Sequence, residues 1–423
     1  MLSKIKLAKK TFAIFLTFMP CLVFCQHIKR CGTIEYWEQK KLNDPTLVVA
    51  EAKAKSDAES WKISHSFMSH SSAVIIVPVV VHVLYHTNAE NISDAQIESQ
   101  IDVLNDDFSK LNIDVFQVPS DWSSIAADTK IQFCLASLKP DSTSTNGIER
   151  SYTTRTAWEI WELDSMKHSS YGGLDAWNRD YYLNIWVANI AGGLLGITQL
   201  PGGPASSDGM TIQYTAFGRT GHVKAPYHKG RTTTHEAGHW LGLSHVWGDD
   251  NATCSGSDFM NDTPNQTDAT YGCPSFPLLD ACSPVSPGIM FMNYMDYTDD
   301  LCMHMFTHDQ AALMNAVLHT SRASIQNSNA CTATSTKEFI RVYYPGPGTI
   351  VQIRISFASA SLLEVTLTDM LGRPVIQKTL YPEAQAIISL NEELDFTSIP
   401  NGIYVLSLNS TAVSETRKIS IQH

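Results

Sequence analysis

Residues 235–245 of this chain, HEAGHWLGLSH, constrain its fold more than any other segment, because they predict a helix that stops abruptly. His235 and His239 are four residues apart, so on an α-helix they lie on the same face. Gly242 lets the helix end and the chain turn sharply, and His245 can then fold back toward the other two imidazoles. Three histidines with one open position describe a catalytic zinc site rather than a structural one.

Glu236 follows the first histidine and is placed to act on a water held by that metal. The plain alternative is an amphipathic helix with surface histidines, but five fixed positions match by chance in about one such chain in several thousand. Other histidines lack this spacing, so we expect them to be structural or solvated: His82, His222, His228, His304, His308 and His319.

The first 25 residues predict export. Residues 11–25 form an apolar run that contains Pro20, and they follow a basic start. The run is shorter than the roughly 20 residues of a membrane-spanning helix and fits the centre of a signal peptide, with a cut before Gln26. A lipid-modified Cys25 is the alternative. No later run reaches about 18 apolar residues, so we expect no transmembrane anchor in the mature chain.

The charge narrows the choice of partners. The chain has 30 Lys and Arg against 42 Asp and Glu, a net charge of −12. An acidic chain is a poor ligand for nucleic acid, which requires a basic surface. It is equally unsuited to docking on an anionic membrane.

The order of patterns predicts several domains. Residues 26–72 are polar and partly helical, and they end in the linker-like stretch from Ser64 to Ser72. Residues 73–85 form a short β-branched apolar run, which predicts a buried strand. Ser93 and Gln96 have capping-box spacing, and an amphipathic helix face follows them to Leu111. Further strands are expected at 131–136, 182–190 and 209–215, which together indicate an α/β layer domain.

The second half of the chain is different. Residues 219–306 are rich in Gly, Pro, Asn and Asp and should be mostly irregular. Thr307 and Gln310 form a second capping box, which opens a helix to about Arg322. After a Ser/Asn/Thr-rich linker at 324–336, residues 337–423 alternate between short strands and turns, as in a small all-β unit.

Two segments resemble motifs of the metzincin clan of metallopeptidases. HEAGHWLGLSH resembles the long zinc consensus of the clan, and MNYMDYTDDLCMHMFT (292–307) resembles its methionine turn. The resemblance is closest to the pappalysin family, with its ulilysin-like and mirolysin-like enzymes. It covers roughly residues 73–322 and implies an α/β catalytic domain with a mixed sheet and helices, then a largely irregular C-terminal half. Five further segments support it in the same order: VPVVVHVLY, SQIDVLNDDFSKLN, IQFCLA, NIWVANIAGGLLGITQLPGG and SDFMNDTPNQ.

The resemblance implies a role for each matching residue. His235, His239 and His245 would bind zinc, and Glu236 would be the general base and then the proton donor. Tyr297 would stabilise the oxyanion, and Met295 would form an apolar base beneath the metal; packed side chains are the alternative for both.

A calcium site is implied in the loop after the third histidine. Asp258 and Thr263 would bind Ca²⁺ there, together with main-chain oxygens such as those of Ser257 and Asn261. Oxygen ligands at close spacing suit this hard cation. From residue types alone, a turn rich in Asp and Asn explains the segment equally well.

The cysteines divide into pairs and one remainder. Without Cys21 and Cys25 seven are left, an odd number. The family pattern implies the pairs Cys254–Cys282 and Cys273–Cys302, although four cysteines allow three pairings. Cys134 and Cys331 are candidates for a third bridge. Cys31 then remains, and in this family a pro-segment cysteine can fill the fourth zinc position and keep the enzyme latent; a stray thiol is the alternative.

The end of the chain resembles the C-terminal sorting domain of the bacterial type IX secretion system. The resemblance rests on residues 341–348, 363–376 and 395–408, although the expected YPNP is YPGP here. It implies translocation across an outer membrane by the secretion machinery. A β-sandwich that binds substrate or carbohydrate is the alternative.

We therefore expect a secreted zinc-dependent endopeptidase of proteins or peptides, made as a cysteine-latched zymogen. Its predicted parts are a signal peptide (1–25), a pro-segment (26–72), a catalytic domain (73–332) and a sorting domain (337–423). A secreted adhesin or substrate-binding protein with a non-catalytic zinc site is the alternative. Arginine-preferring relatives carry an acidic residue just before the cysteine matched by Cys302; Leu301 stands there, so we expect no strong preference for basic residues.

Overall fold

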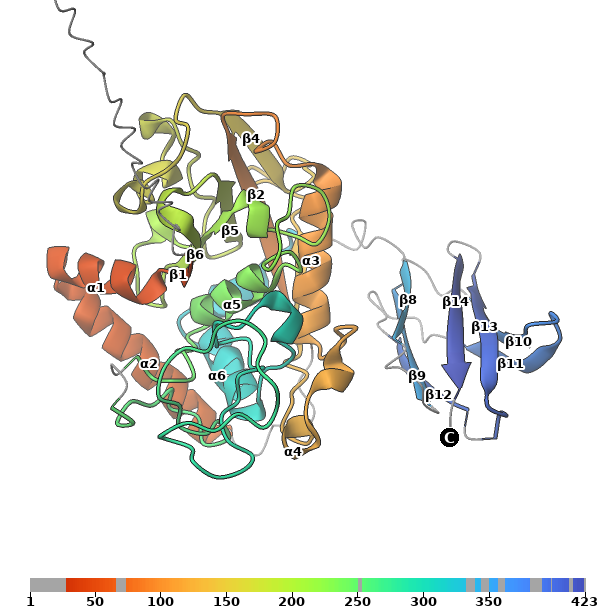
Figure 1. The fold of residues 1–423 in the computed structure, drawn as a ribbon. Helices are drawn as coiled ribbons and strands as arrows, with labels where there is room; N and C mark the ends of the chain where they lie inside the picture. Colours follow the sequence, from red (N-terminus) through yellow and green to blue (C-terminus); the bar gives the residue numbers. More distant parts are fainter. Residues whose placement is uncertain are drawn as a thin grey trace, which may run out of the picture.

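The computed structural model (Figure 1) describes residues 28–65, 74–249, 253–331, 339–343, 350–356, 362–380, 390–396, 398–410 and 414–421. The predicted signal peptide, most of the linker from Ser64 to Ser72, and the YPGP segment lie outside the described residues. Within the described residues, no helix is both long enough and apolar enough to cross a membrane.

A mixed sheet organises the first part of the chain. Along its main path the strand order is β1-β6-β7-β5-β2-β3, and β4 also pairs with β2. The pairs are parallel except for β6 and β7, which run antiparallel. The bounds are β1 Lys29–Cys31, β2 Ile75–Tyr85, β3 Ile131–Leu135, β4 Ile148–Tyr152, β5 Leu183–Ala188, β6 Leu194–Thr198 and β7 Met210–Gln213.

The four strands predicted from sequence are confirmed as β2, β3, β5 and β7, and the α/β fold is confirmed with them. The sequence analysis missed β1, β4 and β6. β1 (KRC) and β4 (IERSY) are mostly polar, and β6 (LLGIT) contains a glycine and is buried throughout, so none of the three shows the apolar pattern of a strand clearly. β1 completes the sheet from the N-terminal segment, because it pairs in parallel with the edge strand β6.

Six α-helices accompany the sheet in the described residues: α1 Thr33–Asn43, α2 Thr46–Ser64, α3 Asp94–Phe108, α4 Ser120–Ser123, α5 Arg231–Trp240 and α6 His308–His319. Ser93 caps α3 by accepting a hydrogen bond from the Gln96 amide, and Thr307 with Gln310 forms a full capping box on α6. α6 ends earlier than predicted, and the chain continues in a 3-10 helix.

Short 3-10 helices fill several of the connections. Their bounds are Val115–Gln117, Ile160–Glu162, Ser165–Lys167, Ser169–Tyr171, Ala191–Gly193, Ala205–Ser207, Tyr214–Ala216, Asp300–Cys302 and Ala323–Asn327. Between α5 and α6 the described chain is otherwise without helices or strands, as the sequence predicted for most of 219–306.

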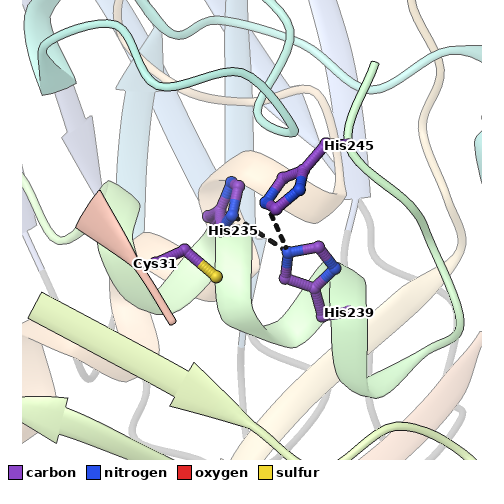
Figure 2. Close-up of side chains that lie close together, drawn as sticks. All are labelled: Cys31, His235, His239 and His245. Carbon is purple, nitrogen blue, oxygen red and sulfur yellow. Dashed lines mark hydrogen bonds between the residues drawn. The ribbon is translucent and has the colours of Figure 1, made fainter. Parts of the chain in front are cut away.

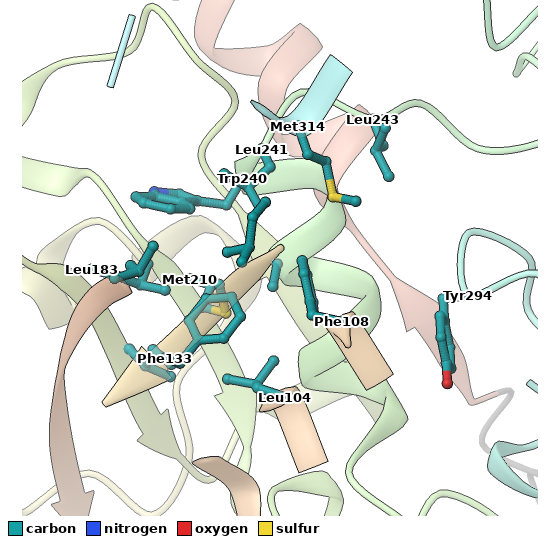
Figure 3. Packing of buried hydrophobic residues seen from close by; sticks show 14 of the residues in the cluster. Leu104, Phe108, Phe133, Leu183, Met210, Trp240, Leu241, Leu243, Tyr294 and Met314 are labelled. Atoms are coloured by element: carbon teal, nitrogen blue, oxygen red, sulfur yellow. The ribbon is translucent and has the colours of Figure 1, made fainter. Parts of the chain in front are cut away.

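The core lies between the sheet and helices α3, α5 and α6 (Figure 3). Phe108 of α3 packs edge-on against Phe133 of β3, with ring centroids 4.9 Å apart. Trp240 and Leu241 at the end of α5 join the same buried cluster, together with Met314 of α6. Every residue of α5 is buried, so the helix that carries the histidines is held on all sides.

The N-terminal segment packs on this body. In Figure 1, α2 runs alongside α6, and β1 lies close to α5. Trp37 of α1 is 1% exposed and shares a small apolar cluster with Leu47 of α2 and Leu200, which follows β6. The predicted pro-segment is therefore folded against the sheet and α6.

Three disulfides join the irregular parts. They are Cys254–Cys282, Cys273–Cys302 and Cys134–Cys331, and among the described cysteines only Cys31 is free. The first two are the pairs implied by the family resemblance. The third ties β3 to the end of the predicted catalytic domain.

The last part of the chain is all β, as predicted. One antiparallel sheet has the order β11-β10-β13-β14 and the other β12-β9-β8. The strands are β8 Phe339–Tyr343, β9 Ile350–Ser356, β10 Leu363–Asp369, β11 Pro374–Leu380, β12 Leu390–Asp395, β13 Gly402–Asn409 and β14 Ser414–Ile421. This unit has its own buried apolar cluster, which includes Leu367, Phe396 and Leu406.

Candidate metal centre

Helix α5 carries two of the three predicted histidine ligands. His235 and His239 project from one face, with the Nε2 atoms 3.1 Å apart. The helix ends in a Schellman motif: the amide of Leu243 donates to the carbonyl of Gly238, and that of Gly242 to His239. Gly242 adopts φ +90°, which a side chain disfavours. This turn brings His245 back to the helix.

The three imidazoles converge on one point. The Nε2 atom of His245 lies 3.0 Å from that of His239, and Figure 2 shows the Cys31 sulfur facing the same group. Three nitrogens at corners of a tetrahedron around zinc would lie about 3.3 Å apart, given Zn–N bonds of about 2.0–2.1 Å. The donor set therefore fits a zinc ion, and its ligand atoms all lie within 4.8 Å of one another.

Each imidazole is oriented by its other nitrogen. Nδ1 of His235 donates to the carbonyl of Tyr294 at 2.7 Å, and Nδ1 of His239 to that of Leu243 at 2.8 Å. Nδ1 of His245 lies 2.8 Å from a carboxylate oxygen of Asp249. With a proton on each Nδ1, each Nε2 keeps its lone pair for a metal.

Burial also keeps His235 and His239 neutral. It lowers the pKa of His235 well below its usual range, and nearby imidazoles act in the same direction. The pKa of His239 falls to about 3, chiefly through burial and then through His245. Neutral imidazole is the form that binds a metal.

Glu236 faces the edge strand of the sheet. Its Oε2 accepts a hydrogen bond from the hydroxyl of Thr33 at 2.8 Å, and Oε1 has no hydrogen-bond partner among the described residues. Burial raises the pKa of Glu236 to about 7. β6 can pass this close because position 196 is glycine; a Cβ there would lie 2.7 Å from the Glu236 side chain.

Met295 and Tyr297 flank the histidines. A Cβ on Gly238 would lie 2.4 Å from the Met295 sulfur, so the methionine packs directly against α5. The Tyr297 ring centroid is 4.9 Å from that of His245 and 5.6 Å from that of His235. Its hydroxyl lies 3.4 Å from the carbonyl oxygen of Cys31.

Cys31 is fully buried at the end of β1. Burial raises the pKa of its thiol well above the usual range, and the charge of Glu236 adds to this. The amide of Thr33 donates to its sulfur at 3.3 Å.

The predicted calcium residues are brought together only in part. The Thr263 hydroxyl donates to the Asp258 carboxylate at 2.8 Å, and Asp258 is 5% exposed. The side chains of the other two make different contacts: Ser257 accepts from the Phe259 amide, and Asn261 donates to Asp309.

A buried ion pair lies beside the metal centre, and the sequence did not predict it. Nη2 of Arg30 lies 2.8 Å from the Asp300 carboxylate and 2.9 Å from the Met303 sulfur. The guanidinium lies over the Tyr227 ring, 4.9 Å from its centroid. The side chain of Leu301, the position considered in the sequence, is 47% exposed. Asp300, one residue earlier, is the acidic residue that contacts Arg30.

Comparisons with known proteins identify relatives of this chain. Residues 169–319 match the profile of the peptidase family described as pregnancy-associated plasma protein-A. Residues 342–422 match a secretion system C-terminal sorting domain. An extracellular metalloprotease of Pyricularia oryzae is 30% identical over 307 residues, which cover 70% of this chain and 90% of the relative.

Two solved structures are similar at higher identity. A mutant of Tannerella forsythia promirolysin is 45% identical with a TM-score of 0.65, covering 71% of this chain and 97% of that one. Mature Tannerella forsythia mirolysin in complex with a cleaved peptide is 49% identical with a TM-score of 0.59, covering 60% and 97%.

Proposed function

Because this chain belongs to the pregnancy-associated plasma protein-A family of metallopeptidases, the pappalysins, and is an extracellular metalloprotease, we propose that it is a zinc-dependent endopeptidase made as a cysteine-latched precursor. The observation that carries the proposal is the convergence of three histidine nitrogens and the Cys31 sulfur within 4.8 Å. Three neutral imidazoles and one exchangeable position are what a catalytic zinc site requires.

His235, His239 and His245 would hold the zinc, which supplies Lewis acidity toward the scissile carbonyl and a water. Glu236 would take the proton from the attacking water and deliver it to the leaving amine. Its unpartnered Oε1 supports this role, since a buried acceptor without a donor has a free position for that water.

Tyr297 would donate a hydrogen bond to the oxyanion of the tetrahedral intermediate. Its hydroxyl is near the Cys31 carbonyl oxygen in the precursor, where it can meet a peptide carbonyl. Met295 would support the histidines through its packing on α5 and would not touch the substrate.

Cys31 would keep the precursor latent by filling the fourth position on the metal with its thiolate. β1 supports this, because it adds to the edge of the sheet where an extended substrate would bind. The register pairs Cys31 with Gly196, the residue that Glu236 packs against.

The ion pair between Arg30 and Asp300 supports a preference for basic side chains beside the cleaved bond. Asp300 is fully buried, so removal of the pro-segment would leave its charge without a cationic partner, held only by the backbone amides of Lys229 and Arg231. A substrate arginine or lysine would replace Arg30 there. Lysine fits as well as arginine, because only Nη2 of Arg30 contacts Asp300, and Nε and Nη1 have no hydrogen-bond partner among the described residues. The expectation based on Leu301, no strong preference for basic residues, is the alternative that a cleavage profile decides.

The division into a signal peptide (1–25), pro-segment (26–72), catalytic domain (73–332) and sorting domain (337–423) is part of the proposal. The folded unit of α1 and α2 supports the pro-segment, and the match to a secretion sorting domain supports the sorting domain. The sorting domain would engage the outer-membrane secretion machinery.

A calcium ion bound by Asp258 and Thr263, with main-chain oxygens of Ser257 and Asn261, is also proposed. A nearly buried carboxylate beside a hydroxyl supports it. Excess EGTA, at a concentration that leaves zinc bound, should lower the melting temperature, and calcium should restore it. Asp258→Asn should abolish that response; an unchanged melting temperature would exclude the site.

The central test uses the chain from Gln26 onward. Zinc content and cleavage of a quenched-peptide library are measured before and after limited proteolysis. We expect one zinc per chain, activity only after the pro-segment is lost, and cleavage next to Arg or Lys. Glu236→Gln should keep the zinc and abolish cleavage, whereas Asp121→Asn, an exposed carboxylate, should change neither. Bound zinc without cleavage in the processed wild type would favour a binding protein.

A further inference from the structure

Thr33 occupies the space between the edge strand and Glu236. It is fully buried as the first residue of α1. Its hydroxyl donates to Oε2 of Glu236 at 2.8 Å and accepts from the backbone amide of Thr198 at 2.9 Å. A hydroxyl can donate and accept at once, so this one side chain meets both partners.

These partners belong to separate parts of the predicted reaction. Glu236 is the proposed general base, and Thr198 is the last residue of β6, whose amides would pair with an extended peptide once β1 has left the sheet. Thr198 also donates from its own hydroxyl to the carbonyl of Glu236 at 3.1 Å. The amide and the carboxylate are therefore held at a fixed separation, and Thr33 fills it.

The segment Cys31–Thr33 thus covers three functional groups with three different atoms. The sulfur faces the histidines and also interacts with the Glu236 side chain, the Gly32 amide donates to the carbonyl of Gly196 at 3.0 Å, and the Thr33 hydroxyl donates to Glu236. Only the first of these contacts involves the metal position. The other two hold the segment through protein groups alone.

We propose that Thr33 is a second anchor of the latent form, which masks the Glu236 carboxylate through a hydrogen bond that does not depend on the metal. This inference rests on the proposed roles of Cys31 and Glu236. Opening the precursor then requires loss of both the thiolate contact and the Thr33 contact. Opening breaks a hydrogen bond to a buried carboxyl oxygen and also frees the buried amide of Thr198, so the Thr33 contact lowers the open population.

The test measures opening directly rather than activity. In the chain from Gln26 onward, Cys31 is the one described cysteine outside the disulfides, so its rate of alkylation by iodoacetamide reports exposure of the segment. Rates are measured by mass spectrometry with zinc bound and after chelation. Circular dichroism checks that each variant is folded.

Thr33→Val should speed alkylation by about 10- to 100-fold, as expected when a buried acceptor and a buried amide lose their hydrogen-bond partner. Thr33→Ser should stay within a few-fold of the wild type, since it keeps the hydroxyl. Thr46→Val is the matched control: its hydroxyl donates to Asp44 on an exposed part of the pro-segment, so its rate should not change. The ratio of the alkylation rate of the Thr33→Val variant to that of the wild type should be the same with and without zinc.

A double-mutant cycle identifies the partner. In the Glu236→Ala background, Thr33→Val should accelerate alkylation about tenfold less than in the wild type. An equal effect in both backgrounds would overturn the proposal, as would a valine effect that disappears on chelation. Because the readout needs no catalysis, an inactive enzyme would refute the proposed function and leave this result unaffected.

Discussion

The guanidinium of Arg30 and the carboxylate of Asp300 form a 2.8 Å ion pair in which neither side chain is exposed, although 270 residues separate them in sequence. The other oxygen of Asp300 accepts hydrogen bonds from the amides of Lys229 and Arg231 at the start of α5. The helix that carries the histidines therefore also orients the carboxylate that holds the pro-segment.

Arg30→Ala should weaken latency. Removing one member of a buried pair costs about 3–5 kcal/mol because the other charge stays buried, and here that cost falls on the closed form. The precursor should therefore be cleaved faster by trypsin at low concentration. Lys29→Gln is the control, because its pair with Glu35 is exposed and contributes little. Equal cleavage rates for both variants would contradict this role of Arg30.

Asp300→Asn should change the specificity of the processed enzyme. With a neutral side chain at position 300, kcat/KM for peptides with arginine or lysine beside the cleaved bond should fall by roughly 100-fold. This fall corresponds to about 3 kcal/mol, the scale of the cost of an unpaired buried charge. Cleavage of matched norleucine peptides should fall much less. A library profile that is the same for both enzymes would exclude Asp300 as the specificity residue.

Tyr297→Phe should lower kcat by about 10- to 1,000-fold and leave KM nearly unchanged. Removing one donor to an oxyanion has effects of this order, and the ring still packs beside His245 and Trp247. Steady-state kinetics on one quenched peptide separate the two constants. A rise in KM at constant kcat would instead assign Tyr297 to ground-state binding.

Replacing Cys134 and Cys331 together by serine should destabilise the catalytic domain by roughly 2–5 kcal/mol, because their disulfide closes a loop of 197 residues. Denaturant unfolding of the Glu236→Gln background, which avoids autolysis, measures the loss. The zinc content should stay at one per chain, since these cysteines lie in β3 and at the end of the domain. An unchanged midpoint would show that the bridge is dispensable.

A pH dependence is expected from Asp107 of α3. Burial raises its pKa to about 7, although Arg231 acts in the opposite direction. The folded state therefore binds a proton more tightly than the unfolded state, whose aspartate has a pKa near 3.8. The resulting stability is present below about pH 4 and is lost as pH rises through 7.

Asp107→Asn removes this titration. The difference in unfolding free energy between wild type and variant should therefore fall by about 3 kcal/mol from pH 4.5 to pH 8. Denaturant titrations at the two pH values measure it, and effects common to both proteins cancel. A difference that grows with pH would mean that Asp107 is ionised in the folded protein.

The sequence was most informative where the chemistry is local. His235 and His239 are four residues apart on one helix, and Gly242 permits the turn that returns His245, so spacing alone predicted the metal centre. The long apolar run of β2 and the capping residues of α3 and α6 were equally predictable, because hydrophobic periodicity and helix capping depend on residues that are close in sequence.

Contacts across the chain were not predictable in that way. Arg30 with Asp300 and Thr33 with Glu236 each join segments more than 200 residues apart. No period or spacing links such residues, so the sequence does not reveal that Asp300, rather than its neighbour Leu301, meets Arg30. The Cys134–Cys331 disulfide was expected only because these two cysteines remained after the other pairs were assigned, and the structure confirms it. The sequence by itself determined the kind of site, since ligand types and local helix geometry are written in eleven consecutive residues. Tertiary structure decided what closes that site, because burial and charge pairing arise only when β1 adds to the edge of the folded sheet.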